Sequence, residues 1–229
     1  MSDAIKAAAQ GMRYWEQKQA AMANNLANVS TPGFKGEKVF ARLLDGQVSG
    51  LGVVDQGEGT RQVTDRAMDF ALEGDGFFVV ETPNGERYTR AGSFSLNAEG
   101  VLVDQGGNAV QAGGGGSIVL PPGTVNVTSN GDIEVDGAVV ATFKIAAVPQ
   151  GQNLEREGGV YFLPSTGEVA PEPGSFRVHQ GQLEESNVDP MMGLVDMLDV
   201  QRNYAALQRT ISVADGIEGR IANDIGRIE

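Results

Sequence analysis

The sequence predicts an α+β fold in which long N- and C-terminal helices pair as an antiparallel coiled coil, with an all-β central domain inserted between them. Three observations support this prediction. Apolar residues recur at helical spacing at both ends of the chain, residues 3–29 and 191–228 contain no proline, and the middle consists of short β-prone segments separated by turn residues. We therefore expect residues 1–35 and 186–229 to form a helical domain and residues 36–185 a β domain.

The N-terminal helix is predicted from apolar or small side chains that recur every three or four residues. Repeats that average 3.5 residues place one narrow apolar seam on a helix, where it packs against another helix. The helix should end near Asn28, because asparagine is a poor interior helix residue and Thr31-Pro32-Gly33 favours a turn. The expected seam residues are Ile5, Ala8, Met12, Trp15, Met22, Leu26 and Val29, interrupted only by Gln19.

The C-terminal helix carries the same spacing and has a clear start. Asp189 can accept hydrogen bonds from the first free backbone amides, and Pro190 suits the first helical position because its missing N–H has no partner there in any case. Its seam is interrupted only by Glu218. The seam residues are Met197, Val200, Tyr204, Leu207, Ile211, Ala214, Ile221, Ile225 and Ile228.

The central region switches to short strands with frequent turns. Phe77–Val80 and Tyr88–Arg90 flank Pro83-Asn84-Gly85, and Asn-Gly tolerates the positive φ angles of a tight hairpin turn. A sandwich or barrel-like β domain follows from many such segments. The further strands expected are Ser93–Leu96, Val101–Val103, Ile133–Val135 and Val139–Val148.

Composition argues against several classes of function. The chain has 229 residues and a formal net charge of −13, which disfavours binding to phosphate backbones and to anionic lipid surfaces. We therefore expect no nucleic-acid binding. No apolar run of residues approaches membrane-spanning length, so we also expect no direct membrane insertion. The first residues are amphipathic and lack the apolar core of a secretory signal, so we expect any export to use a route without a cleaved signal peptide.

The candidates for chemistry are weak. The chain has no cysteine, and His179 is its only histidine, so thiol catalysis and the usual histidine-based sites lack parts. Asp132, Glu134 and Asp136 imitate the start of a calcium loop, but position twelve is Phe143 instead of a carboxylate. We expect no catalytic site, no metal site and no cofactor, and we interpret residues 113–116, Gly-Gly-Gly-Gly, as a turn or flexible link.

The two helical seams allow two interpretations. Seams of this kind often form the core of an intramolecular coiled coil, and they also serve as contacts between subunits of a polymer. Gly216, Gly219 and Gly226 weaken the last helix by about 1 kcal/mol each relative to alanine, which favours a helix that is held by neighbours. Our hypothesis is that the two ends are largely mobile in the monomer and become ordered on assembly.

Four motifs then resemble a known family, and they occur in the family's order. They are residues 24–35 (NNLANVSTPGFK), residues 72–78 (LEGDGFF), residues 88–94 (YTRAGSF), and residues 181–189 (GQLEESNVD) followed by 201–204 (QRNY). Together they resemble the signatures of the bacterial flagellar axial proteins, the rod and hook family, and the match spans essentially the whole chain. The residues of the N-terminal motif that carry the resemblance are Asn24, Asn25, Asn28, Thr31, Gly33 and Phe34.

The resemblance implies a structural subunit of the flagellar basal-body rod, located in the periplasm and exported by the flagellar type III apparatus. It implies that the terminal helices pack as the inner tube of a helical polymer, with copies of the same chain and other rod proteins as partners and the β domain outside. The short β region is most similar to the rod members of the family, with distal-rod or hook-type subunits as alternatives. A secreted adhesive or carbohydrate-binding β module and a hydrolase with paired carboxylates are the competing classes.

Overall fold

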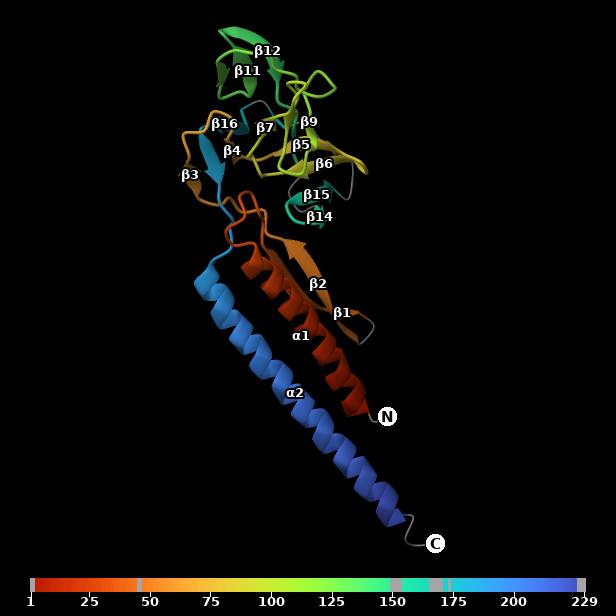
Figure 1. The fold of residues 1–229 in the computed structure, drawn as a ribbon. Coiled ribbons are helices and arrows are strands. Elements are labelled where there is room, and N and C mark those ends of the chain that lie inside the picture. The colour runs from red at the N-terminus through yellow and green to blue at the C-terminus, as the bar shows by residue number, and fades with distance from the viewer. Residues whose placement is uncertain (1–2, 45–46, 149–153, 165–170, 173, 226–229) are drawn as a thin grey trace. The chain divides into compact units, whose positions relative to one another are not determined.

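The computed structural model describes residues 3–44, 47–148, 154–164, 171–172 and 174–225, and its elements are labelled in Figure 1. The chain forms two compact units. A helical unit comprises Met1–Ala27, Glu37–Val53 and Asp189–Glu229, and a β unit comprises Asn28–Gly36 and Val54–Val188. The fold is therefore α+β, with terminal helices on either side of a β-rich region in the sequence, as predicted.

Helix α1 ends and helix α2 begins where the local sequence predicts. Helix α1 spans Asp3–Ala27 and ends one residue before Asn28, while α2 spans Pro190–Ile225. The Oδ1 atom of Asp189 accepts hydrogen bonds from the amides of Met191 (2.8 Å) and Met192 (3.1 Å), which is the expected N-cap. Neither of these helices, within the described chain, has a stretch apolar enough to cross a membrane.

Helices α1 and α2 contact each other within the helical unit (Figure 1). The Tyr204 hydroxyl donates a hydrogen bond to Glu16 (2.9 Å), and Leu207 packs over Gly11, with its Cδ1 atom 3.0 Å from the position of an added Cβ. These two pairs run in opposite order along the helices. The seam of α2 thus faces α1 at its middle turns.

A two-stranded sheet of β1 (Glu37–Leu44) and β2 (Gln47–Val54) packs beside α1. The side chain of Asn25 binds the backbone of Glu37 twice, through its Nδ2 to the carbonyl oxygen and its Oδ1 to the amide, each at 2.9 Å. Gln17 accepts a hydrogen bond from the amide of Gly50 (3.0 Å). Residues 37–53 therefore belong with the helices, although the sequence-based division places them in the β domain.

The β unit is built around one eight-stranded sheet. Seven of its strands follow the order β14-β15-β6-β5-β9-β8-β7, and the eighth, β13, pairs with β5. A three-stranded sheet β10-β11-β12 and the pairs β16-β4 and β17-β3 complete it. Its strands are β3 (Arg61–Val63), β4 (Phe70–Gly74), β5 (Phe77–Thr82), β6 (Gly85–Thr89), β7 (Ser95–Leu96), β8 (Leu102–Val103), β9 (Ala109–Val110), β10 (Val125–Val127), β11 (Asp132–Val135), β12 (Ala138–Thr142), β13 (Ile145–Ala146), β14 (Leu154–Arg156), β15 (Tyr161–Pro164), β16 (Phe176–Gln180) and β17 (Gln182–Glu184).

Strand β5 is buried on both faces and separates two apolar clusters. Phe78 and Val80 belong to the larger cluster, where Phe78 packs edge-on against Phe94 and Phe143 with ring centroids 5.3 and 5.2 Å apart. The alternate side chains of β5, Phe77 and Val79, belong to the second cluster. Because successive strand residues point to opposite faces, this alternation places β5 at the centre of the unit.

Most predicted strands are confirmed, and one is wrong. The hairpin of β5 and β6 turns at Pro83-Asn84, with Gly85 at a φ of 98°, and the β7–β8 and β11 segments lie where expected. The predicted strand Val139–Val148 is instead two strands, β12 and β13. The chain changes sheets at Phe143, which is buried, and Lys144, which is half-buried. Strand β12 pairs with β11, whereas β13 pairs with β5.

Candidate subunit-packing site

The helical unit carries most of the exposed apolar surface. Ten of the fifteen large apolar side chains that are exposed in the described part of the chain belong to it, although it is the smaller unit. Large exposed apolar patches on soluble proteins mark interaction surfaces. The ten are Phe40, Leu43, Leu51, Met191, Met192, Leu194, Val195, Leu198, Val213 and Ile217.

The predicted seam residues lie on the covered sides of the helices, to different extents. Ile5 and Val200 are buried, and Val200 is only 1% exposed. Ile221 and Ile225 lie in α2 but their side chains fall outside the described part, and Ile228 lies outside the described residues altogether. The half-buried seam residues are Met12, Trp15, Met22, Leu26, Val29, Met197, Tyr204, Leu207, Ile211 and Ala214.

A second apolar stripe on α2 was not predicted. Met191, Leu194, Val195 and Leu198 follow the spacing i, i+3, i+4, i+7 and are 72, 48, 55 and 54% exposed. At about 100° per residue, this stripe lies roughly opposite the seam that faces α1. The spacing is visible in the sequence, but the longer seam, which shares the same helix, obscures it. We call these four residues the outer stripe.

A groove runs between α1 and the β1–β2 sheet. It has a volume of about 410 Å³, and half of its lining residues are alanine or glycine. The Gln17 and Glu37 side chains lie close over Gly50 and Gly52, since a Cβ on either glycine would meet one of them at about 2 Å. Gln17, Ala20, Ala21, Asn24, Glu37, Val39, Gly50 and Gly52 line this groove, which we call the α1 groove.

In the β unit, three of the family-like motifs meet at one buried carboxylate. Oε1 of Glu184 lies 2.5 Å from the Lys35 ammonium, and Oε2 lies 3.3 Å from Nη1 of Arg90. All three side chains are almost completely buried. Lys35 also donates to the Gly57 carbonyl (2.7 Å), and Arg90 donates to the carbonyls of Leu72 and Gly74. We call Lys35, Arg90 and Glu184 the buried charge cluster.

Burial has a direct effect on the charge of this cluster. Removal from water lowers the pKa of Lys35, and the Glu184 carboxylate partly opposes that shift. The cluster joins residues that are 149 positions apart in the sequence, at the points where the chain enters and leaves the β unit. Its geometry indicates a structural role, because the buried charged groups of the three side chains bind one another and backbone carbonyls of the β unit.

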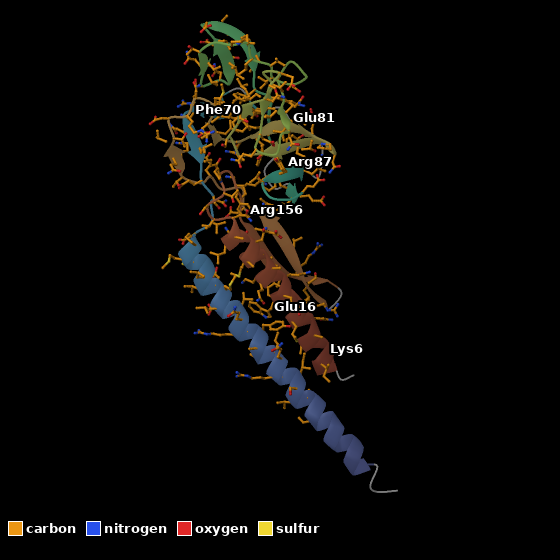
Figure 2. All side chains as sticks on the ribbon, viewed as in Figure 1. Lys6, Glu16, Phe70, Glu81, Arg87 and Arg156 are labelled. Carbon is orange, nitrogen blue, oxygen red and sulfur yellow. The ribbon has the colours of Figure 1, made fainter. Side chains whose placement is uncertain are left out.

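Two further contacts hold the segment around Phe34 and Gly36 in place, one from Arg156 of β14, which is labelled in Figure 2, and one from Asn187. The guanidinium of Arg156 stacks between the rings of Phe34 and Phe162, at 4.4 and 5.1 Å from their centroids, and donates to the Lys35 carbonyl. The Asn187 side chain accepts from the Gly36 amide (2.7 Å) and donates to the Asp55 carbonyl (2.9 Å). Phe34, predicted from its motif, is therefore a fully buried packing residue.

The remaining motif residues form turns and links. Asn28 accepts hydrogen bonds from Thr31 through both its backbone carbonyl (3.0 Å) and its side chain (3.2 Å). Gly33 donates its amide to the Glu184 carbonyl (2.7 Å) and has a φ of 70°. Asn24 lines the α1 groove, and Asn25 links α1 to β1 as described above.

Replacing Gly33 with alanine is expected to lower the free energy of unfolding of the β unit by more than about 2 kcal/mol. The new Cβ would lie 2.2 Å from the Ala91 amide, and the left-handed backbone would be strained as well. Urea unfolding followed by circular dichroism measures the change. Gly114→Ala is the matched control, since a Cβ there meets nothing within 4 Å, and equal stability of the two variants would contradict this role for Gly33.

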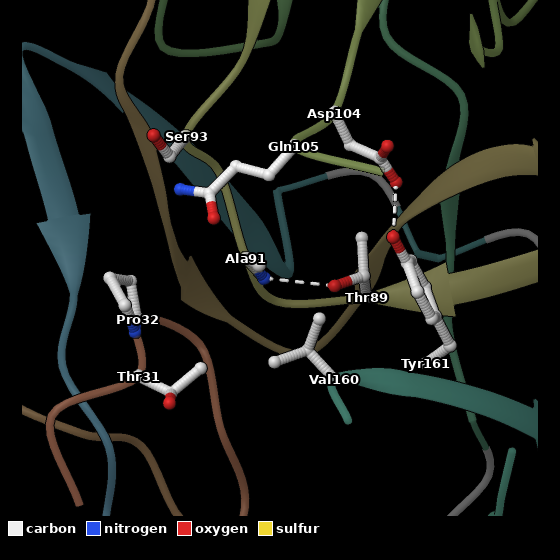
Figure 3. A pocket seen from close by; sticks show the side chains of 9 residues that line it. All are labelled: Thr31, Pro32, Thr89, Ala91, Ser93, Asp104, Gln105, Val160 and Tyr161. Atoms are coloured by element: carbon white, nitrogen blue, oxygen red, sulfur yellow. Dashed lines mark hydrogen bonds between the residues drawn. The ribbon is translucent and has the colours of Figure 1, made fainter. Parts of the chain in front are cut away.

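A small pocket in the β unit is the best candidate for chemistry, and its geometry indicates a structural role (Figure 3). Tyr161 donates to Asp104 (2.7 Å), and Asn108 donates to both of them. Burial, together with the hydrogen bond to Asp104, raises the pKa of Tyr161 to about 12, so the phenol stays neutral near pH 7. The pocket has a volume of about 50 Å³. Sites that hold small-molecule substrates usually exceed roughly 300 Å³.

The residues singled out for metal or histidine chemistry have other partners. Nε2 of His179 lies 2.6 Å from Oε2 of Glu73, and this bond lowers the pKa of Glu73, with Arg61 as the second cause. Asp132 accepts from the Thr142 hydroxyl, and Asp136 accepts from the Thr124 amide. Within the described ranges, no three His, Cys, Asp or Glu side chains form a group that could hold a metal ion.

Comparison with known proteins agrees with the motifs. Residues 5–35 match the family described as "Flagella basal body rod protein", residues 71–141 match "Flagellar hook protein FlgE/F/G D1 domain", and residues 179–224 match "Flagellar basal body rod FlgEFG protein C-terminal".

Whole-chain relatives give the same result. The chain is 33% identical over 223 residues to the flagellar basal-body rod protein FlgF of Caulobacter vibrioides, covering 90% of this chain and 91% of the relative. It is 30% identical over 253 residues to FlgG of the same organism (93% and 95%), and 31% identical over 232 residues to FlgF of Salmonella typhimurium (89% and 90%).

Proposed function

Because this chain belongs to the family of flagellar basal-body rod proteins, we propose that it is a structural subunit of the bacterial basal-body rod. It assembles with other axial proteins into a helical tubular shaft that transmits motor torque. Proteins of this family are structural and are not enzymes.

The observation that carries the proposal is the uneven distribution of exposed apolar side chains. Among the residues that the structure describes, the helical unit exposes ten large apolar side chains along α2 and the β1–β2 sheet, whereas the larger β unit exposes five. A unit with this much uncovered apolar surface is suited to burial by neighbouring subunits.

We assign the two parts of the chain different places in the shaft. The terminal segments, residues 1–35 and 186–229, pair as an antiparallel coiled coil and form the inner core. The β domain, residues 36–185, lies outside except for its first two strands, β1 and β2, which pack beside α1. The predicted seam residues, from Ile5 to Leu26 and from Met197 to Ile228, are the packing residues of that core. The Glu16–Tyr204 and Gly11–Leu207 contacts support the pairing.

A shaft requires heterologous contacts, in which one surface of a subunit meets a different surface of the next. Such contacts propagate along the assembly instead of closing into a dimer. Ends that become ordered only on assembly would protect the subunit from premature polymerisation, because their contacts with other subunits form only when neighbours are present.

The proposed location is the periplasmic part of the flagellar basal body. The chain reaches it through the flagellar type III export apparatus, without a cleaved signal peptide and without direct insertion into the membrane. Copies of the chain and other rod proteins are its partners. Membership of the rod-protein family supports this location and these partners.

Within the family, the proposal favours a FlgF-type rod subunit. The short β region supports it, as do the matches to FlgF proteins over about nine tenths of the chain. A FlgG-type distal-rod subunit or a hook-type axial subunit is the alternative. The 30% identity to FlgG is only slightly below the 33% identity to FlgF of the same organism.

A tagged chain tests the proposed function directly. An epitope inserted between Gly114 and Gly115 lies in a turn where a Cβ would meet nothing within 4 Å, so it should leave the fold intact. In cells whose own copy is deleted, we expect the tagged chain to restore swimming and to be present in purified basal bodies. Normal swimming of the deletion strain, with the tagged chain absent from basal bodies, would contradict the proposal.

A further inference from the structure

The helical unit carries two different unfilled surfaces, the outer stripe on α2 and the α1 groove. The outer stripe presents Met191, Leu194, Val195 and Leu198, all 48% exposed or more. The α1 groove is a concave surface of about 410 Å³, and four of its eight lining residues are alanine or glycine. We propose that the outer stripe of one copy docks into the α1 groove of a second copy of this chain. This inference rests on the proposed function and specifies which surfaces make its subunit contact.

The seam of α2 is the first argument, because it already has a partner in the same chain. Tyr204 is bonded to Glu16 of α1, Leu207 packs on Gly11 of α1, and Val200 of the same seam is buried. Polymer contacts then need another surface. The outer stripe lies roughly opposite the seam on the same helix, and after Leu198 the same side carries Arg202, Ala205, Arg209 and Ser212 before the next large apolar residue, Val213.

Shape is the second argument. Bulky, flexible methionine and leucine side chains project from the stripe, while the groove is bordered by Ala20, Ala21, Gly50 and Gly52. Large side chains that enter a recess lined by small ones give close contact between elements. The two surfaces belong to different elements, so the contact is heterologous and propagates from copy to copy.

Charge is the third argument, because the chain as a whole is acidic but these two surfaces have opposite signs. Residues 189–201 hold Asp189, Asp196 and Asp199 and no basic residue. Helix α1 and strand β1 together hold five basic residues, Lys6, Arg13, Lys18, Lys38 and Arg42, against three acidic ones, Asp3, Glu16 and Glu37. Opposite charges around an apolar contact select the orientation and speed up association. Two stripes or two grooves facing each other would bring like charges together.

Cysteine crosslinking tests the contact cleanly because the chain has no cysteine of its own. Copies carrying Ala20→Cys with one tag and copies carrying Leu194→Cys with a second tag are expressed together in cells without the native chain. Basal bodies are isolated and treated with a short bismaleimide crosslinker. We expect a mixed dimer that carries both tags, at least tenfold more abundant than either dimer with a single tag.

The matched control is Ser212→Cys, which lies on the same side of α2 beyond the end of the outer stripe. Ser212→Cys copies should give less than a tenth of the mixed dimer with Ala20→Cys copies. Exclusion of Leu194→Cys copies from basal bodies that accept Ser212→Cys copies would also support the docking, since the stripe is then required for entry.

Two results would overturn the inference. Absence of the mixed dimer from basal bodies that contain both variants would refute the docking and leave the proposed function standing. Single-tag dimers as abundant as the mixed dimer would point to a contact between like surfaces. Absence of all three variants and of the tagged wild-type chain from basal bodies would instead refute the proposed function, and this inference with it.

Discussion

Replacing Leu207 with aspartate is expected to abolish both incorporation into the rod and swimming, while the β unit stays folded. Leu207 packs over Gly11 at the point where α2 contacts α1, with its Cδ1 atom 3.0 Å from the position of a Cβ on that glycine. A carboxylate held there without a partner costs several kcal/mol, so the helix pair should open. Swimming in soft agar and the amount of the chain in purified basal bodies measure the effect.

Ser212→Asp is the control, because it adds the same charge to the same helix at an exposed position. It should change swimming by less than a factor of two. Normal swimming of the Leu207→Asp strain would contradict the account of the helix pair, and the same substitution at Ile211, another half-buried seam residue, is expected to behave like Leu207→Asp.

Replacing Glu184 with alanine is expected to lower the free energy of unfolding of the β unit by about 3–5 kcal/mol. The substitution removes the one carboxylate that binds both Lys35 (2.5 Å) and Arg90 (3.3 Å), and it leaves two buried cations without their counter-ion. The hydrogen bond from the Gly59 amide to Oε1 of Glu184 is lost as well. Urea unfolding of the full chain, followed by circular dichroism, measures the change.

The neighbouring residue provides the matched control. Glu185 is exposed, and its carboxylate accepts a hydrogen bond from Thr60 at the surface. Glu185→Ala should cost less than about 1 kcal/mol, since exposed polar contacts contribute little. Equal effects of the two substitutions would show that the buried charge cluster does not determine the stability of the β unit.

The parts of the fold that could be predicted from the sequence are those encoded by neighbouring residues. The end of α1 near Asn28 and the N-cap at Asp189 follow from capping and turn chemistry within a few residues. The β5–β6 hairpin follows from Asn84-Gly85 between two apolar runs. Each of these features depends on backbone preferences that a short segment carries by itself.

The parts that could not be predicted depend on distant partners. Nothing near β1 shows that Asn25 will bind the backbone of Glu37 and hold the sheet against α1. The break between β12 and β13 arises because the two parts of one β-prone run pair with different strands, the first with β11 and the second with β5. Strand propensity describes the segment and not its partner, so it predicts one continuous strand there.

The candidate site shows the same limit. The spacing of apolar residues predicts the seam on each helix. It does not single out the outer stripe on α2, because the stripe overlaps along the chain with the start of the longer seam on the same helix. Apart from the helix end at Asn28 and the turn at Thr31-Pro32-Gly33, the sequence assigns the motif residues no physical role. Only the structure brings Lys35, Arg90 and Glu184 into contact, and it places Phe34 and Gly33 in the packing of the β unit instead of on an assembly surface.

The central claim is that the helical unit is the part of this chain that neighbouring subunits cover. A density map of the intact basal body, at a resolution that separates helices, tests it most directly. The account predicts that α1 and α2 lie in the inner tube of the rod, with the outer stripe of α2 covered by an adjacent subunit and the β unit outside. A map in which the outer stripe faces solvent and the β units make the contacts between subunits would contradict it.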